Sequence, residues 1–184
     1  MLDARGDARG LRARSVTVGY GKDAPILEDL SLDVLEGQLT VIVGPNACGK
    51  STLLRSLARV LGVRSGAVEL DGRALTTMNQ KELARRLGLL AQSSTAPADI
   101  LVEDLVARGR YPHQSLLRQW SAEDDEAVAW AMRQSGVEAL ARRRVGELSG
   151  GQRQRVWIAM VLAQSTDIVL LDEPTTYLDL NHQL

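Results

Sequence analysis

Residues 39–52, LTVIVGPNACGKST, form the stretch that decides the fold of this chain. The apolar and largely β-branched residues at 39–43 predict a short buried strand. Residues 44–51 then match the phosphate-loop pattern G-x-x-x-x-G-K-[ST] at every required position. Leucines at 53, 54 and 57 predict a helix directly after the loop. Since strand, loop and helix follow one another as the motif requires, we predict a nucleotide phosphate site.

The residue types of this loop suit phosphate binding. Glycines let backbone N–H groups approach phosphate oxygens, and a helix N-terminus adds the positive end of its dipole. Lys50 would reach the β- and γ-phosphates, the Ser51 hydroxyl would bind Mg²⁺, and the Thr52 hydroxyl would add a phosphate contact. The predicted nucleotide contacts in the loop are Gly44, Pro45, Asn46, Ala47, Cys48, Gly49, Lys50, Ser51 and Thr52.

A second set of chemical groups follows two further apolar segments. The predicted strand at residues 167–171 ends in Asp172 and Glu173. Asp172, at the carboxyl end of the strand, would bind the Mg²⁺ that bridges the β- and γ-phosphates. Glu173 projects in the opposite direction and would activate the attacking water. Gln92 follows the predicted strand at 87–91 and would contact Mg²⁺ or the water, although an amide there is also an ordinary loop residue.

The composition is that of a globular domain. Of the 184 residues, 45% are apolar and 24% are charged. The net charge of −1 and the 3% of aromatic residues argue against nucleic-acid binding. The single cysteine excludes an internal disulfide and fits a reducing compartment. The first fifteen residues hold four arginines and two aspartates and do not form a secretory signal. Because no apolar run is long enough to cross a bilayer, we expect a cytosolic chain.

The elements along the chain predict an α/β fold. We expect a polar leader at residues 1–14, strands at 15–20 and 26–34, and a strand at 66–70 that an Asp-Gly turn closes. Helices are predicted at 79–86, at 102–108 and after Ser121, where Asp124 is the capping partner. The predicted architecture is a P-loop NTPase core with a mostly parallel sheet, an N-terminal antiparallel β portion, and an inserted helical subdomain at about residues 93–164.

Two further features allow more than one interpretation. Tyr20 precedes a turn, so its ring could stack on an adenine or be an ordinary aromatic of an edge strand. Residues 148–152, LSGGQ, place Ser149 and two glycines at a predicted helix N-terminus, which makes a second anion cradle. One chain has little use for two cradles on one nucleotide, whereas two facing chains do. The Ser-Gly-Gly string is also a common structural turn.

Taken together, these residues resemble the ATP-binding subunit of an ATP-binding cassette (ABC) transporter over about residues 12–184. The matching features are Tyr20 as the adenine-stacking aromatic, residues 44–52 as Walker A, Gln92 as the Q-loop, LSGGQ as the signature, residues 168–172 as Walker B, Glu173, and Asp179 as the D-loop.

The resemblance implies an ATPase in which two subunits enclose two ATP molecules, with Mg²⁺ as cofactor. The implied catalytic residues are Glu173, Gln92 and Lys50, and the implied metal-binding residues are Ser51, Gln92 and Asp172. The signature residues implied to contact nucleotide across the dimer are Ser149, Gly150, Gly151 and Gln152. Asp179 would join the two sites.

A finer resemblance is to the importers of ferric siderophores, haem and cobalamin. GRYPHQ at 109–114 and the segments around LSGGQ and LDEPTTYLD are most similar to the ferric-siderophore branch, of the enterobactin type. This implies transmembrane permease subunits and a second ATP-binding subunit as partners, and indirectly a periplasmic or lipoprotein substrate-binding protein, but no nucleic acid. It also implies a peripheral location on the cytoplasmic side of the plasma membrane.

The sequence departs from the family where it ends, at Leu184. Family members continue through a further strand to a switch histidine, and His182 does not match that histidine. We therefore expect a C-terminally truncated form, with unpaired backbone groups in the core, marginal stability and poor ATP hydrolysis. Near-normal turnover by residues 1–184 would contradict this expectation. The alternative is a non-catalytic nucleotide-binding fragment. A soluble cassette protein of DNA repair or translation and a small-molecule kinase explain fewer of the motifs.

Overall fold

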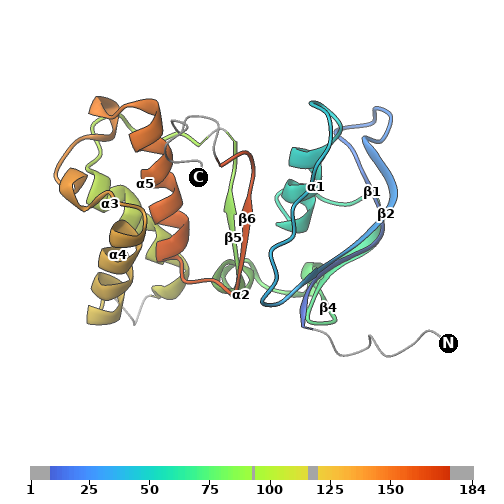
Figure 1. The fold of residues 1–184 in the computed structure, drawn as a ribbon. Coiled ribbons are helices and arrows are strands. Elements are labelled where there is room, and N and C mark those ends of the chain that lie inside the picture. Colours follow the sequence, from blue (N-terminus) through green and yellow to red (C-terminus); the bar gives the residue numbers. More distant parts are fainter. Residues whose placement is uncertain (1–8, 93, 116–119, 175–184) are drawn as a thin grey trace. The chain divides into compact units, whose positions relative to one another are not determined.

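The computed structural model describes residues 9–92, 94–115 and 120–174 (Figure 1). The chain divides into two compact units, Met1–Leu83 and Ala84–Leu184, and the boundary falls within helix α2 (Gln80–Arg86). The predictions made for Asp179 and His182 lie outside the described residues.

An antiparallel sheet forms the first unit, as predicted. Its four strands lie in the order β2-β1-β3-β4. Their bounds are β1 (Gly10–Val18), β2 (Leu27–Leu35), β3 (Ser65–Leu70) and β4 (Arg73–Ala74). The turn between β3 and β4 is the predicted Asp71-Gly72 pair, and both residues have positive φ, at 51° and 75°. A short 3₁₀ helix, η1 (Leu75–Thr77), follows.

Strand β1 begins earlier than expected. Residues 10–14, which the sequence placed in a polar leader, belong to the strand. Leu11 and Ala13 are fully buried, and β1 pairs with both β2 and β3 at these positions. The alternating arginines concealed this short apolar pattern. Because β1 is the central partner of two strands, its first half is part of the core.

Helix α1 (Lys50–Leu57) packs against β1. Its buried face consists of Thr52, Leu53, Leu54, Ser56 and Leu57. This helix is the one predicted to follow the phosphate loop.

The strand predicted at residues 39–43 is not formed among the described residues. Leu39 is 91% exposed and Val43 is 88% exposed. A strand requires ladder hydrogen bonds to a neighbour, and no described strand pairs with this segment. The apolar pattern alone does not form a strand here, and the prediction of a buried strand at residues 39–43 is wrong for this structure.

The second unit contains a parallel pair, β5 (Leu87–Leu90) and β6 (Ile168–Leu171). Leu87 pairs with Ile168 and Leu90 with Leu171, and the Asp172 N–H extends the ladder by donating to Leu90 O at 2.9 Å. These two strands are the described part of the parallel sheet that the sequence predicted.

Three helices gather on one side of this pair (Figure 1). They are α3 (Val102–Ala107), α4 (Ala122–Gln134) and α5 (Gly150–Ala163), with 3₁₀ helices η2 (Arg108–His113), η3 (Glu138–Leu140) and η4 (Val145–Glu147) between them. Their shared core includes the fully buried Val102, Val106, Ala131, Val137, Val156 and Ala159. The predicted Ser121–Asp124 capping box begins α4.

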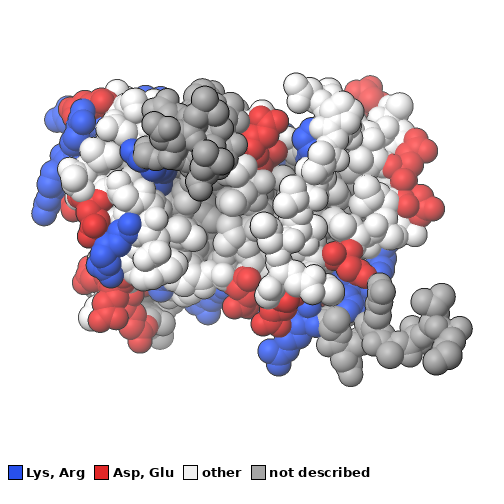
Figure 2. Space-filling view, viewed as in Figure 1, with Lys and Arg blue, Asp and Glu red and all other residues white. Residues whose placement is uncertain are grey.

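Acidic and basic side chains are both present on the face seen in Figure 2. Among the residues that the structure describes, none of the helices has the length and apolar character needed to cross a lipid bilayer.

Candidate nucleotide-binding site

The phosphate loop turns sharply between residues 44 and 50. Ala47 and Gly49 have φ of 62° and 96°, and the Cys48 N–H donates to Pro45 O at 3.4 Å. A Cβ on Gly49 would lie 2.9 Å from Leu27 Cδ2 and 3.0 Å from Ile26 Cγ2. Glycine is required here both because of the positive φ and because the Ile26 and Leu27 side chains fill the space.

Lys50 holds the loop together. Its ammonium donates to Gly44 O at 2.9 Å and to Pro45 O at 2.7 Å. Residues 44–48 are exposed. Gly49 is the N-cap of α1 and has no side chain that could bond the first N–H groups of this helix. An exposed turn, an ammonium group and a helix N-terminus together fit a phosphate chain.

Tyr20 is tied to α1 through its hydroxyl group. Arg55 Nη1 donates to Tyr20 Oη at 3.1 Å. Hydrogen bonds from Thr52 and then Arg55 lower the pKa of Tyr20, although partial burial opposes this. Thr52, predicted as a phosphate contact, is 6% exposed and its side chain bonds Tyr20. The first unit thus brings Tyr20 and the phosphate loop together.

In the second unit, two acidic residues follow the carboxyl end of the β5–β6 pair. Asp172 is buried at 3% exposure, whereas Glu173 is exposed and has φ of 51°. Gln92 Nε2 donates to Glu173 Oε2 at 2.7 Å. The second unit therefore brings Gln92 and Glu173 together, as their positions after paired strands require.

The signature segment begins helix α5. Ser149 Oγ accepts from the Gln152 N–H at 3.2 Å, and Gln152 Oε1 accepts from the Ser149 N–H at 3.1 Å. This reciprocal capping box leaves the exposed Ser149 hydroxyl its own proton to donate. The Ser-Gly-Gly string thus begins a helix through a capping box, and the exposed hydroxyl at this helix N-terminus is compatible with anion binding.

The oxygen ligands suit Mg²⁺. In the first unit the Ser51 hydroxyl, and in the second unit the Asp172 carboxylate, are each the kind of hard oxygen donor that Mg²⁺ prefers. Across residues 9–92, 94–115 and 120–174, no group of three or more His, Cys, Asp or Glu residues is arranged to hold a metal.

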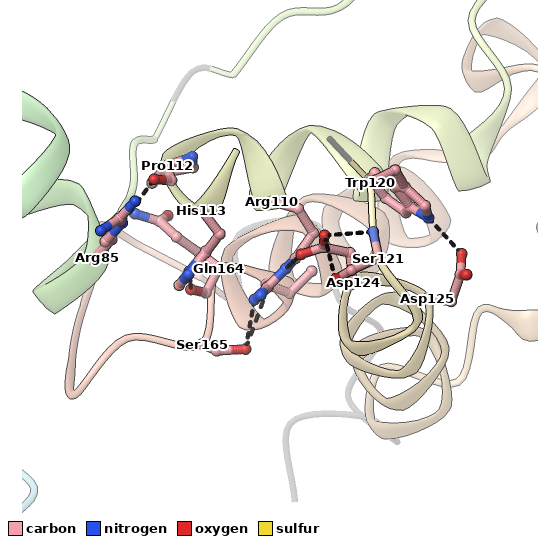
Figure 3. Close-up of polar contacts among 11 residues, drawn as sticks. Arg85, Arg110, Pro112, His113, Trp120, Ser121, Asp124, Asp125, Gln164 and Ser165 are labelled. Atoms are coloured by element: carbon pink, nitrogen blue, oxygen red, sulfur yellow. Dashed lines mark hydrogen bonds and ion pairs between the residues drawn. The ribbon is translucent and has the colours of Figure 1, made fainter. Parts of the chain in front are cut away.

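Sequence reasoning missed the role of the GRYPH segment at 109–113. Arg110 is buried at 5% exposure and donates to Asp124 Oδ1 at 2.8 Å, to Ala163 O at 2.7 Å and to Ser165 Oγ at 3.0 Å (Figure 3). His113 Nε2 donates to Gln164 O at 2.8 Å. These contacts secure the C-terminal end of α5, whose N-terminus carries the signature.

Gly109 completes this attachment by close approach. A Cβ there would lie 2.2 Å from Met160 O, a backbone atom of α5. Nothing near Gly109 in the sequence indicates this contact, because Met160 lies about fifty positions further along the chain.

Comparison with known proteins identifies this arrangement. The family model described as "ABC transporter" matches residues 27–176. The chain belongs to the ABC transporter family. The match includes the phosphate loop, the Gln92–Glu173 pair and the signature helix of this ABC domain.

Curated relatives of this ABC domain share much of its sequence. The ferric enterobactin transport ATP-binding protein FepC of Escherichia coli (strain K12) is 56% identical over 174 residues, which are 95% of this chain and 64% of FepC. The iron(3+)-hydroxamate import ATP-binding protein FhuC of Bacillus subtilis (strain 168) is 47% identical over 174 residues, 95% of this chain and 64% of FhuC. The chain therefore spans less than two thirds of these relatives.

A solved structure agrees with the fold. A nucleotide-free ATP-binding cassette from an ABC transporter is 26% identical, with a TM-score of 0.76, and the match covers 90% of this chain and 69% of that one. The predicted α/β P-loop NTPase fold class is confirmed.

Proposed function

We propose that this chain is the ATP-binding and ATP-hydrolysing subunit of an ABC importer, and that the importer carries iron-siderophore complexes. The observation that carries the proposal is the phosphate loop, in which Lys50 bonds the carbonyls of Gly44 and Pro45 at the start of α1. Two relatives, the ferric enterobactin transport protein FepC and the iron(3+)-hydroxamate import protein FhuC, support the choice of cargo.

Each residue has a distinct chemical role in this proposal. Lys50 leaves its loop carbonyls for the β- and γ-phosphates, which are stronger partners for an ammonium group. Ser51, Gln92 and Asp172 would hold Mg²⁺, which neutralises charge on the phosphates when it is bound. Glu173 accepts a proton from the attacking water, and the amide of Gln92 orients the Glu173 carboxylate through the 2.7 Å hydrogen bond.

A second copy of the chain would complete each site. The exposed Ser149 hydroxyl, with Gly150, Gly151 and Gln152 at the N-terminus of α5, suits the γ-phosphate of a nucleotide bound to the partner subunit. Asp179 would link the two sites. Transmembrane permease subunits and, indirectly, a substrate-binding protein are the further partners, with this chain peripheral on the cytoplasmic side of the membrane.

The exposed segment at residues 39–43 favours one alternative, a chain that binds ATP without hydrolysing it. Val43 directly precedes the phosphate loop and is 88% exposed. A loop without a strand partner in front of it holds its N–H groups less rigidly, and catalysis depends on such positioning more strongly than binding does.

Equilibrium binding of ATP and single-turnover hydrolysis by residues 1–184 test the proposal. We expect Mg²⁺-dependent ATP binding that Lys50→Ala removes and that Lys22→Ala, at an exposed lysine outside the loop, preserves. Binding followed by turnover supports the ATPase. Binding without turnover supports the alternative, and absence of binding by the unsubstituted chain contradicts both.

A further inference from the structure

One arginine holds the turn that follows Tyr20. Arg64 Nη1 donates to Asp23 O at 2.7 Å, and Arg64 Nη2 donates to Tyr20 O at 3.1 Å and to Gly21 O at 3.2 Å. A guanidinium group presents several N–H donors in a fixed plane, so a single side chain can hold three carbonyl groups at once.

The backbone of Arg64 is fixed directly before the start of β3. Its backbone N–H donates to Thr17 O at 2.8 Å, and the next residue, Ser65, pairs with Thr17 where β3 meets β1. The side chain then crosses Gly19, where a Cβ would lie 2.7 Å from Arg64 Nη2. The absence of a side chain at Gly19 therefore gives the guanidinium its route to the turn.

The ring of Tyr20 is held at its other end by the phosphate-loop helix. Arg55 Nη1 donates to Tyr20 Oη at 3.1 Å, and Thr52 also bonds this hydroxyl. Tyr20 is nevertheless 42% exposed, which leaves ring surface accessible. Two arginines thus fix both the backbone and the hydroxyl group of Tyr20.

We propose that Arg64 is a positioning residue for the base of the nucleotide. It holds the Tyr20 backbone so that the ring is preorganised for stacking, and it does so without touching the nucleotide. This inference rests on the proposed ATP site at Tyr20 and the phosphate loop. A base stacks most tightly on an aromatic ring that needs no ordering on binding. Removing Arg64 should therefore weaken recognition of the base and leave recognition of the phosphates unchanged.

Two ligands separate these effects in the same chain. Magnesium ATP carries the base, and magnesium tripolyphosphate carries only the phosphate chain. With residues 1–184, we expect Arg64→Met to weaken ATP binding about 5- to 10-fold, a part of the stacking contribution. Tripolyphosphate binding should stay within about 2-fold, since Lys50 and the loop are unchanged.

Matched variants complete the test. Lys22→Met removes an exposed cation from the same turn and should change neither affinity. Tyr20→Ala should reproduce the selective loss of ATP affinity, and Arg64→Met added to Tyr20→Ala should have no further effect, because Arg64 acts through the ring. Arg64→Lys keeps the charge and loses the planar fork, so it should show the same selective loss, and it decides the question if Arg64→Met does not fold.

Equal weakening of both ligands by the Arg64 variants, or additive effects with Tyr20→Ala, would overturn the inference. So would unchanged ATP affinity in Arg64→Met. If Lys50→Ala still removes binding in that case, the proposed ATP site stands and only the role of Arg64 fails. If the unsubstituted chain binds neither ligand, the proposed function of the site fails with it. If Tyr20→Ala binds ATP normally, the stacking role of Tyr20 and the role of Arg64 fail, and the proposed ATP site at the phosphate loop stands.

Discussion

The amide of Gln92 donates a 2.7 Å hydrogen bond to the carboxylate of Glu173, across 81 positions of sequence. The strand register accounts for this contact. Leu90 pairs with Leu171 at the end of the parallel ladder, so Gln92 and Glu173 each stand two residues past a paired position. Because parallel strands end at the same edge, this pairing brings the two side chains to one place.

This contact predicts coupled kinetic effects. Glu173→Gln should lower single-turnover ATP hydrolysis by at least about 100-fold, since it removes the proposed general base, and should preserve ATP binding. Gln92→Ala should lower turnover less, and the part of its effect that acts through Glu173 should disappear in the Glu173→Gln background. Gln134→Ala, at an exposed glutamine of α4, is the matched control. Full turnover by Gln92→Ala would disprove the coupling.

Local sequence patterns predicted local structure well. The Ser121–Asp124 capping box, the Asp71-Gly72 turn and the turn at Lys50 each depend on residues a few positions apart, and the structure contains all three. A pattern that a few neighbouring residues complete can be recognised without knowing the rest of the fold.

Burial and long-range contacts were less predictable. The apolar run at residues 39–43 predicted a buried strand, yet Leu39 is 91% exposed because no described strand pairs with it. Arg110 lies 53 positions from Ala163 in the sequence, so the residues near Arg110 do not predict its hydrogen bond to the Ala163 carbonyl. Burial depends on what the rest of the chain brings to a segment.

The buried pair of Arg110 and Asp124 predicts a large loss of stability. The side chains are 6% and 1% exposed and lie 2.8 Å apart. Arg110→Met leaves the Asp124 carboxylate buried without its cation, which should lower the free energy of unfolding by about 3–5 kcal/mol in urea titrations. Arg142→Met is the control, because Arg142 is 83% exposed in its pair with Glu103 and should cost no more than about 1 kcal/mol. Equal losses in the two variants would contradict this interpretation.

The same pair predicts that the free energy of unfolding depends on pH. Burial opposes ionisation of Asp124, but hydrogen bonds from Arg110 and Ser121 outweigh it and hold the pKa of Asp124 below its usual value. A folded-state pKa below the unfolded one adds stability that is fully present above the unfolded pKa, about 4, and is lost as the pH falls through the folded pKa. The stability difference between the original chain and Asp124→Asn should therefore shrink in urea titrations taken from about pH 6 to about pH 3. A constant difference over this range would show that folding does not shift the pKa of Asp124, and a difference that grew as the pH fell would show that folding raises it.

Gly109 predicts that a single methyl group is poorly tolerated beside α5. In Gly109→Ala the new Cβ would be 2.2 Å from Met160 O, and a backbone oxygen within a helix cannot rotate away as a side chain can. The segment at 109–113 would have to shift, which disturbs the Arg110 contacts with Ala163 and Ser165. We expect the free energy of unfolding to fall by about 1–3 kcal/mol. Gly62→Ala is the matched control, since nothing lies within 4 Å of the Cβ it would gain, and it should change stability by less than about 1 kcal/mol. If Gly109→Ala were as stable as Gly62→Ala, the close approach of this segment to α5 would not contribute to the stability of the fold.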